Sequence, residues 1–233
     1  MNTKRSYPWR GLGMIVLALL ICAGALLIVK ATVARSASTT IHVNSTDGGT
    51  GGPDCRLRDA ISAANSGAVV GGCDGSPGGP FILELVDSPQ GALYEFYEID
   101  NNSNALPIIT SDITINGHGG EILRSNQVNT PDFRFFEVAE TGTLHLNEVT
   151  VRYGGIVTAG GNLKNQGTTY IQGAIFQFGR AESGGSINNE GTMTISHSKI
   201  INNYAGCGGG IMNEENGILK VTDSLVLENV GDI

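Results

Sequence analysis

The chain has 233 residues, of which 34 are glycine, 15% are charged and only 6% are aromatic. A formal net charge of −8 disfavours nucleic acid, whose phosphates need a basic surface, and disfavours docking of the folded part on anionic lipid. A hydrophobic fraction of 40% is too high for a disordered chain. Many glycines with few aromatic residues are instead typical of short strands joined by tight turns.

The first 34 residues have the layout of an export signal. Three basic residues and no acidic one precede an uncharged run at 11–29, and small residues at 32 and 34 fit a cleavage site. We therefore predict that residues 1–34 are a signal peptide. An uncleaved membrane anchor is the alternative, because an apolar run of this length can just span a bilayer. In both cases residues 36–233 are expected to be extracytoplasmic, either secreted or at the cell surface.

Residues 38–105 are predicted to form an N-terminal cap and the first strands. An opening strand is expected at residues 40–43, a loop rich in glycine and aspartate at 44–54, and a short helix at 57–65 with its apolar residues on one face. A solenoid needs an atypical terminal unit of this kind, because its open end would expose unpaired strands. Arg58 and Asp59 of the helix are expected to tie the cap to the first coil.

The cysteines outside the N-terminal segment are Cys55, Cys73 and Cys207. In an oxidising compartment, Cys55 and Cys73 are close enough in sequence to be predicted as a disulfide, worth about 3 kcal/mol from loop closure. Metal ligation is the alternative, but no CxxC and no nearby histidine support it. Cys207 has no evident partner and is expected to be a small apolar residue in a tight, glycine-rich turn.

Residues 106–233 contain a repeat of about 24 residues. Gly-Gly pairs end at residues 161, 185 and 209, and an asparagine follows four residues after each pair. Each copy carries three short stretches in which apolar and polar residues alternate, without a helical stretch between them. This pattern predicts an all-β fold, a right-handed parallel β-helix in which equivalent strands stack on one another. The asparagines at the fixed position are expected to form a hydrogen-bonded ladder: Asn165, Asn189 and Asn213.

Several stretches resemble a known family. Residues 55–65 (CRLRDAISAAN) closely resemble the signature of CSLREA-domain proteins, with Arg56 where serine is usual and Asp59 where glutamate is usual. The resemblance continues through residues 106–117 and 133–138, and the repeats are similar to those of polymorphic outer membrane proteins. It implies a bacterial, exported β-helix protein that is often surface-displayed. The chain is short for this family and stops in mid-repeat, so its repeats are interpreted as truncated at the C-terminus.

No complete catalytic constellation is present in the sequence. Gly117-His118-Gly119 resembles one short motif of polygalacturonases, but the companion motifs are absent, so a turn is expected. Isolated histidines are expected to face solvent: His42, His145 and His197. Acidic residues of the turns are expected to form a solvated row, with weak Ca²⁺ binding as the alternative to the prediction of no cofactor: Glu182, Glu190, Glu214 and Glu215. Exposed aromatic residues are candidates for stacking on sugar rings: Tyr153, Tyr170 and Phe178.

Three functional hypotheses follow. The preferred one is a non-enzymatic, adhesin-like or envelope-structural module, with extracellular glycans or cell-surface proteins as partners, no nucleic acid, and the membrane only through an uncleaved N-terminal segment. The second is a carbohydrate-active β-helix enzyme, a lyase or glycosidase, which would need at least two carboxylates on one face. The third is a truncated fragment without a function of its own.

Overall fold

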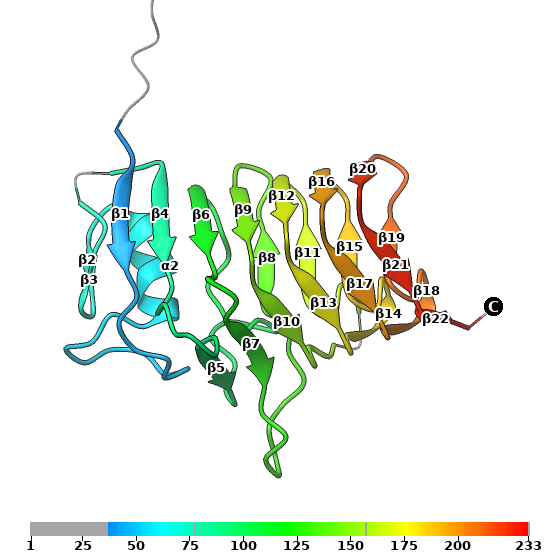
Figure 1. The fold of residues 1–233 in the computed structure, drawn as a ribbon, viewed down its shortest axis with the longest axis horizontal. Helices are drawn as coiled ribbons and strands as arrows, with labels where there is room; N and C mark the ends of the chain where they lie inside the picture. Colours follow the sequence, from blue (N-terminus) through cyan, green and yellow to red (C-terminus); the bar gives the residue numbers. More distant parts are fainter. Residues whose placement is uncertain (1–36, 77, 157, 233) are drawn as a thin grey trace, which may run out of the picture. The chain divides into compact units, whose positions relative to one another are not determined.

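The computed structural model describes residues 37–232, with the exception of residues 77 and 157. It is a parallel β-solenoid of about five turns with about 26 residues per turn, and it contains one short helix. Strands from successive coils stack in rows, from β1 to β20 along one face (Figure 1). The predicted parallel β-helix is therefore confirmed. The predicted signal peptide or anchor, residues 1–34, lies outside the described residues.

The two largest sheets form two faces of the solenoid. The strands of the seven-stranded sheet are β1 (Thr39–His42), β4 (Phe81–Glu84), β6 (Asp112–Asn116), β9 (Thr143–Asn147), β12 (Thr168–Gln172), β16 (Thr192–Ser196) and β20 (Ile218–Thr222). The strands of the six-stranded sheet are β5 (Leu93–Phe96), β7 (Glu121–Arg124), β10 (Thr150–Arg152), β13 (Ile175–Gln177), β17 (Lys199–Ile201) and β21 (Leu225–Leu227). Their apolar residues alternate as predicted, so that Leu144 and Leu146 are buried while His145 between them is not.

Two shorter sheets complete the coils. The strands of the four-stranded sheet are β8 (Phe136–Val138), β11 (Leu163–Asn165), β15 (Ile187–Asn189) and β19 (Ile211–Asn213). A three-stranded sheet was not predicted, and its strands are β14 (Arg180–Ser183), β18 (Tyr204–Cys207) and β22 (Val230–Gly231). The later coils thus have four strands rather than three. Each of β14 and β18 buries one small side chain, Ala181 or Ala205, which gives the sequence little apolar alternation.

The predicted repeat spacing holds for only part of the solenoid. Thr168 of β12 pairs with Thr192 of β16, which is the interval that the glycine pairs predict. By contrast, the interval from Thr192 to its partner Ile218 is slightly longer, and that from Asp112 to its partner Thr143 is longer still. Extra residues enter the loops between strands, so the parallel register of the core strands is kept. One of these loops, between β7 and β8, projects from the lower side of the solenoid (Figure 1).

The glycine pairs permit the close stacking of coils at one corner. Gly184 has φ of +62°, a left-handed conformation that glycine adopts without the steric cost of a side chain. A Cβ on the next residue, Gly185, would lie 2.1 Å from the backbone oxygen of Gly209 in the following coil. Any larger residue at position 185 would therefore push the coils apart.

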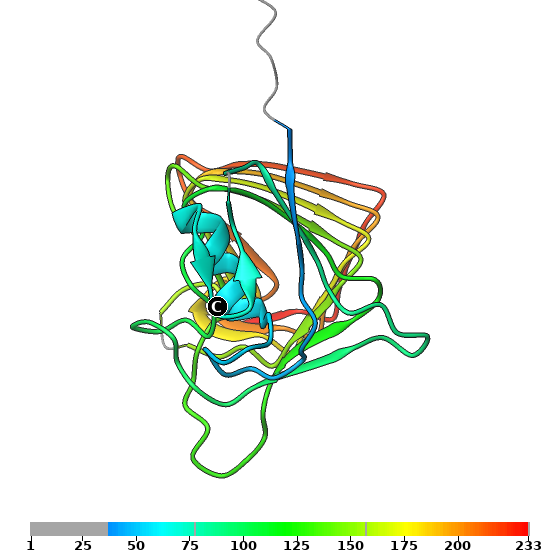
Figure 2. The same cartoon turned by 90° about the vertical axis from the view of Figure 1, so that its left-hand side faces the viewer.

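The cap consists of β1, helix α2 (Leu57–Ser66) and the antiparallel pair β2 (Val69–Val70) and β3 (Cys73–Asp74). Helix α2 lies across the end of the coils when they are viewed along their stacking direction (Figure 2). The helix ends at Gly67, which has φ of +63° and whose backbone amide donates a hydrogen bond to Ala63 O. Gly67 therefore forms a left-handed C-cap. Among the described residues, no helix is long and apolar enough to cross a membrane.

Arg58 anchors helix α2 to the first coils. Its Nε donates to the backbone oxygen of Ala105 at 2.7 Å, and its Nη2 donates to that of Glu98 at 2.5 Å. Its guanidinium also lies 5.4 Å from the centre of the Phe96 ring. Asp59 has a different partner, the backbone amide of Gly51 in the cap loop. Arg58 therefore links the cap to the solenoid as expected, whereas Asp59 organises the cap itself.

Candidate functional site

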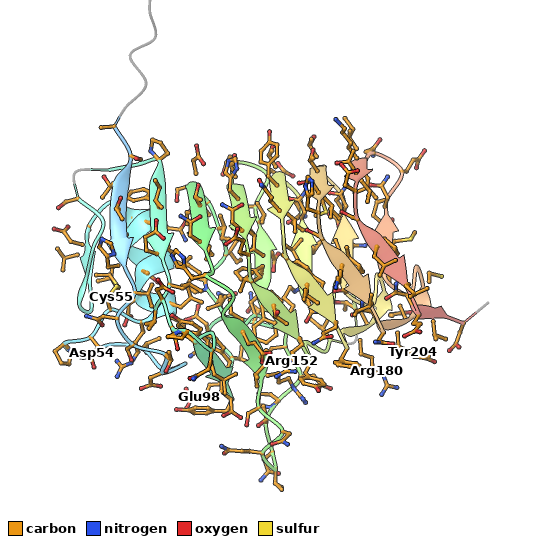
Figure 3. All side chains as sticks on the ribbon, viewed as in Figure 1. Asp54, Cys55, Glu98, Arg152, Arg180 and Tyr204 are labelled. Atoms are coloured by element: carbon orange, nitrogen blue, oxygen red, sulfur yellow. A yellow bond between two sulfur atoms is a disulfide. The ribbon has the colours of Figure 1, made fainter. Side chains whose placement is uncertain are left out.

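An open groove of about 690 Å³ runs along the corner between the six-stranded and three-stranded sheets. This volume is within the range of small-molecule sites. Aromatic side chains of three coils line it, contributed by Tyr153, Phe178 and Tyr204. Arg152, Arg180 and Tyr204 all lie along the lower edge of the molecule in Figure 3. This groove is the candidate site because it brings aromatic and charged side chains together on one exposed surface.

Tyr153 and Phe178 stack on each other across adjacent coils. Their ring centres are 5.1 Å apart and the ring planes differ by 10°. Both rings remain exposed, at 43% and 40%. They follow directly after paired strands, since Arg152 of β10 is in register with Gln177 of β13. Two residues that look scattered in the sequence thus form one continuous aromatic surface.

The backbone at these two positions is unusual for aromatic residues. Tyr153 has φ of +65° and Phe178 has φ of +53°, in the left-handed region that bulky residues rarely occupy. Asn202 and Glu228 follow strands β17 and β21 at the equivalent corner and also have positive φ. Asparagine suits this conformation better than an aromatic residue does. The corner therefore needs a left-handed residue in each of these coils, but it does not need an aromatic one.

Buried asparagines hold the turn that follows each aromatic residue. Oδ1 of Asn162 accepts a hydrogen bond of 2.9 Å from the Gly154 amide, and Oδ1 of Asn203 accepts one of 2.7 Å from the Gly179 amide. The Asn203 side chain also donates a hydrogen bond of 2.8 Å to Oδ1 of Asn229 in the next coil. The rings are thus presented on a fixed backbone rather than on a free loop.

Charged groups stand at both ends of the groove. Arg124 pairs with Asp132 at 2.7 Å and also donates to the Pro131 oxygen at 2.8 Å. At the other end, the Arg180 guanidinium lies 5.4 Å from the centre of the Tyr204 ring. The Tyr204 hydroxyl donates a hydrogen bond to Asp232, and this bond together with the negative charge of Asp232 raises the pKa of Tyr204.

The predicted asparagine row lies in the four-stranded sheet, apart from the groove lining. Nδ2 of Asn165 donates to Oδ1 of Asn189 at 2.7 Å, and Nδ2 of Asn189 donates to Oδ1 of Asn213 at 2.7 Å. Asn165 and Asn189 are fully buried. These side chains are consumed by contacts between coils and leave no group for a ligand.

The cysteines divide into one bridge and one free thiol. Cys55 and Cys73 form the predicted disulfide, which excludes the alternative of metal ligation by this pair. The prediction for Cys207 was wrong. It is the last residue of strand β18 rather than a turn residue, and its thiol is exposed. Gly208, which follows it, makes the left-handed turn instead.

The other candidate side chains do not converge on a site. His118 has φ of +50° in a turn and contacts Glu84 at 2.7 Å. His42 and His197 are exposed, while His145 stacks on Tyr170 with ring centres 4.6 Å apart. Within the described part of the chain, no three His, Cys, Asp or Glu side chains are placed to hold a metal ion.

The acidic turn residues are likewise spread over different contacts. Glu190 pairs with Lys164 at 3.0 Å, and Glu214 accepts a hydrogen bond from Asn188 at 2.7 Å. Glu182 lies elsewhere, in the lining of the groove. Glu190 and Glu214 follow the paired residues Asn189 and Asn213 of adjacent coils, so the expected row includes these two residues but not Glu182.

Sequence reasoning missed Arg180, Tyr204 and the asparagines under the groove. Arg180 pairs in register with Tyr204 of the next coil, at the same spacing as the glycine pairs. The repeat could therefore have predicted that these two residues are neighbours. The aromatic pair was harder to find, because the interval from Tyr153 to Phe178 is slightly longer than the repeat.

Fold and groove together define a parallel β-solenoid with an open aromatic groove on its side. No family model, no curated protein and no solved structure matches the chain. The groove is therefore the feature of the molecule that bears on its function.

Proposed function

We propose that this chain is an exported, non-enzymatic β-solenoid that binds extracellular glycans in the groove along Tyr153, Phe178 and Tyr204. The observation that carries the proposal is the stacked pair Tyr153 and Phe178, which is exposed in the groove and held in a left-handed backbone. Stacked rings offer a flat apolar surface to the C–H face of a sugar. Polar groups beside them can then contact the sugar hydroxyls.

The strain at the aromatic positions supports a binding role. A side chain in the left-handed region costs roughly 1 kcal/mol or more, and residues held in this way are concentrated at functional sites. Asn202 shows that the same corner can be built from a residue better suited to it. We therefore attribute the tyrosine and phenylalanine at this corner to a contact that their exposed rings make with a ligand.

The proposed location rests on separate evidence. A disulfide between Cys55 and Cys73 suits an oxidising, extracytoplasmic compartment. The charge pattern of residues 1–34 and the resemblance of residues 55–65 to CSLREA-domain proteins point in the same direction. We therefore place the protein at the cell surface or in the medium, as an adhesin-like module.

A carbohydrate-active enzyme is the second candidate. Asp132 and Glu182 both line the groove, and two carboxylates on one face are the minimum for glycoside hydrolysis. Asp132, however, already has one oxygen in an ion pair with Arg124. Release of shorter oligosaccharides from a bound glycan would identify an enzyme and would overturn the proposal of a pure binding module.

The test uses Phe178→Asn, which copies the residue that Asn202 places at the same corner of the next coil. The full chain, purified in mild detergent so that residues 1–36 can be kept, is screened on a glycan array and measured by calorimetry. We expect Phe178→Asn to weaken glycan binding at least tenfold, because one stacking surface is lost. Its melting temperature should change little, because relief of backbone strain offsets the lost ring contact.

Tyr170→Ala is the matched control. Tyr170 is also exposed and stacked, but it lies on the seven-stranded sheet outside the groove lining. It should leave binding unchanged. Equal effects of both variants, or a cooperatively folded wild type that binds no glycan, would refute the proposed site. A wild type without cooperative unfolding would favour the fragment hypothesis.

A further inference from the structure

Arg180 differs from the other arginines near the groove in the contacts of its guanidinium. Arg124 is engaged by Asp132 and by the Pro131 oxygen, and Arg152 is engaged by Glu121. Among the residues that the structure describes, Arg180 makes neither an ion pair nor a side-chain hydrogen bond, and its contact is the face of the Tyr204 ring. Its N–H donors are therefore left for a ligand or for water.

Arg180 is also held in position. Its backbone amide donates to Gly154 O at 2.9 Å, and its backbone oxygen accepts from the Ile156 amide at 3.0 Å. The Tyr204 ring beneath the guanidinium is itself fixed by the hydrogen bond from its hydroxyl to Asp232. An arginine held at its backbone and over an aromatic face loses less freedom when it binds an anion.

The charge balance of the groove restricts the kind of anion. Two positive side chains, Arg124 and Arg180, and two negative ones, Asp132 and Glu182, line it, so its formal charge is zero. The whole chain carries −8. A densely charged polymer such as a sulfated glycan would be repelled by this surface, whereas one carboxylate would match one free guanidinium.

We infer that the groove selects sugars that carry a carboxylate, and that Arg180 binds this carboxylate through two parallel N–H···O bonds. This inference rests on the proposed glycan binding and names its ligand class as uronic acids or other carboxylated sugars. Phe178 precedes Arg180 by two residues at the same turn, so one pyranose ring can meet both. Its C–H face would lie on the aromatic pair while its carboxylate reaches Arg180. Glu182 would accept hydrogen bonds from the sugar hydroxyls.

The experiment compares two probes that differ only at one carboxyl group. Binding of the full chain to an otherwise neutral oligosaccharide that carries a single uronic acid, and to the methyl ester of that oligosaccharide, is measured by calorimetry at fixed ionic strength, with heparin as a sulfated probe. We expect the wild type to bind the acid at least tenfold more tightly than the ester, as one charge-assisted bidentate pair provides. Arg180→Gln should bring this ratio close to one and leave binding of the ester within about twofold.

Two further variants control for charge and folding. Lys199→Gln removes the same charge from an exposed position outside the groove and should keep the preference for the acid. Arg180→Lys keeps the charge but not the planar fork, so it should retain only part of the preference. If Arg180→Gln fails to fold, the change in acid-over-ester preference in Arg180→Lys serves as the test of the role of Arg180.

The failure of this inference is distinguishable from the failure of the proposed function. Equal binding of acid and ester by the wild type, an unchanged preference in Arg180→Gln, or tighter binding of heparin would overturn the role of Arg180 alone. Absence of binding to every probe and to the glycan array would overturn both.

Discussion

Asn189 receives a hydrogen bond of 2.7 Å from Asn165 of the previous coil and passes one of 2.7 Å to Asn213 of the next. Its amide also contacts the Gly191 oxygen at 3.2 Å. The hydrogen bonds of this side chain therefore connect three successive coils. Because Asn165 and Asn189 are both fully buried, the bond between them is shielded from water.

Asn189→Ala is expected to destabilise the protein by about 2–3 kcal/mol, because it removes the four side-chain hydrogen bonds of Asn189, among them the one from the buried Asn165 amide. Asn213→Ala, in the exposed last member of the row, should cost less than about 1 kcal/mol. Urea denaturation followed by circular dichroism measures both. Equal losses in the two variants would show that the row contributes nothing beyond its individual bonds.

Loss of the disulfide should destabilise the cap. Replacing both Cys55 and Cys73 by serine is expected to lower the free energy of unfolding by about 3 kcal/mol, because the loop between them is no longer closed in the unfolded chain. Cys207→Ser, at the exposed free thiol, should change it by less than about 0.5 kcal/mol. Thermal unfolding with and without a reductant provides the check. A wild type that is insensitive to reduction would contradict this role.

Arg58→Met should loosen helix α2. The variant removes the donors to Ala105 O and Glu98 O, and a stability loss of about 2–4 kcal/mol is expected because at least one of these oxygens is left buried without a partner. Arg56→Met is the matched control, since its ion pair is with Asp47 at the surface and should be worth less than about 1 kcal/mol. Hydrogen exchange should show faster opening of the α2 amides in Arg58→Met. Unchanged exchange in that variant would mean that the cap is held by its apolar contacts.

The stability of the protein should fall at alkaline pH through Tyr94. Burial raises the pKa of Tyr94 above its usual range, although its oxygen accepts a hydrogen bond of 2.8 Å from the Val86 amide. Between the unfolded pKa of about 10 and the raised folded pKa, the unfolded chain releases a proton that the folded chain keeps. The contribution of Tyr94 is thus fully present below pH 10 and is lost as the pH rises above it. Unfolding measured from pH 8 to 11 should fall more steeply in wild type than in Tyr94→Phe, and parallel curves would disprove the linkage.

The sequence was sufficient for the core of the solenoid because the core repeats the same physical requirement in every coil. Leu144 with Leu146, and Met193 with Ile195, had to point inward together, and alternation reveals such pairs. Strand β14 escaped detection because Ala181 is its one buried side chain and alanine carries little strand signal.

The groove was harder to predict than the core. Tyr153 and Phe178 were identified as exposed aromatic residues, but their stacking follows from the pairing of β10 with β13, whose interval differs from that of the glycine pairs. Arg180 becomes notable only because, among the described residues, its guanidinium has no ion-pair or hydrogen-bond partner, unlike those of Arg124 and Arg152. Such an absence is a property of the folded surface, and no spacing in the sequence encodes it directly.

The loop between β7 and β8 enters the solenoid without disturbing its register, since Val151 of β10 still pairs with Ile122 of β7. One end of this loop supplies Asp132 to the groove wall, while Val128 further out is 90% exposed. Substitutions in this loop can therefore alter the rim of the groove without altering the pairing of the stacked strands. Insertions, deletions or grafted peptides at residues 126–130 can reshape one wall of the groove, so new ligand preferences are open to selection or to engineering while the framework beneath stays the same.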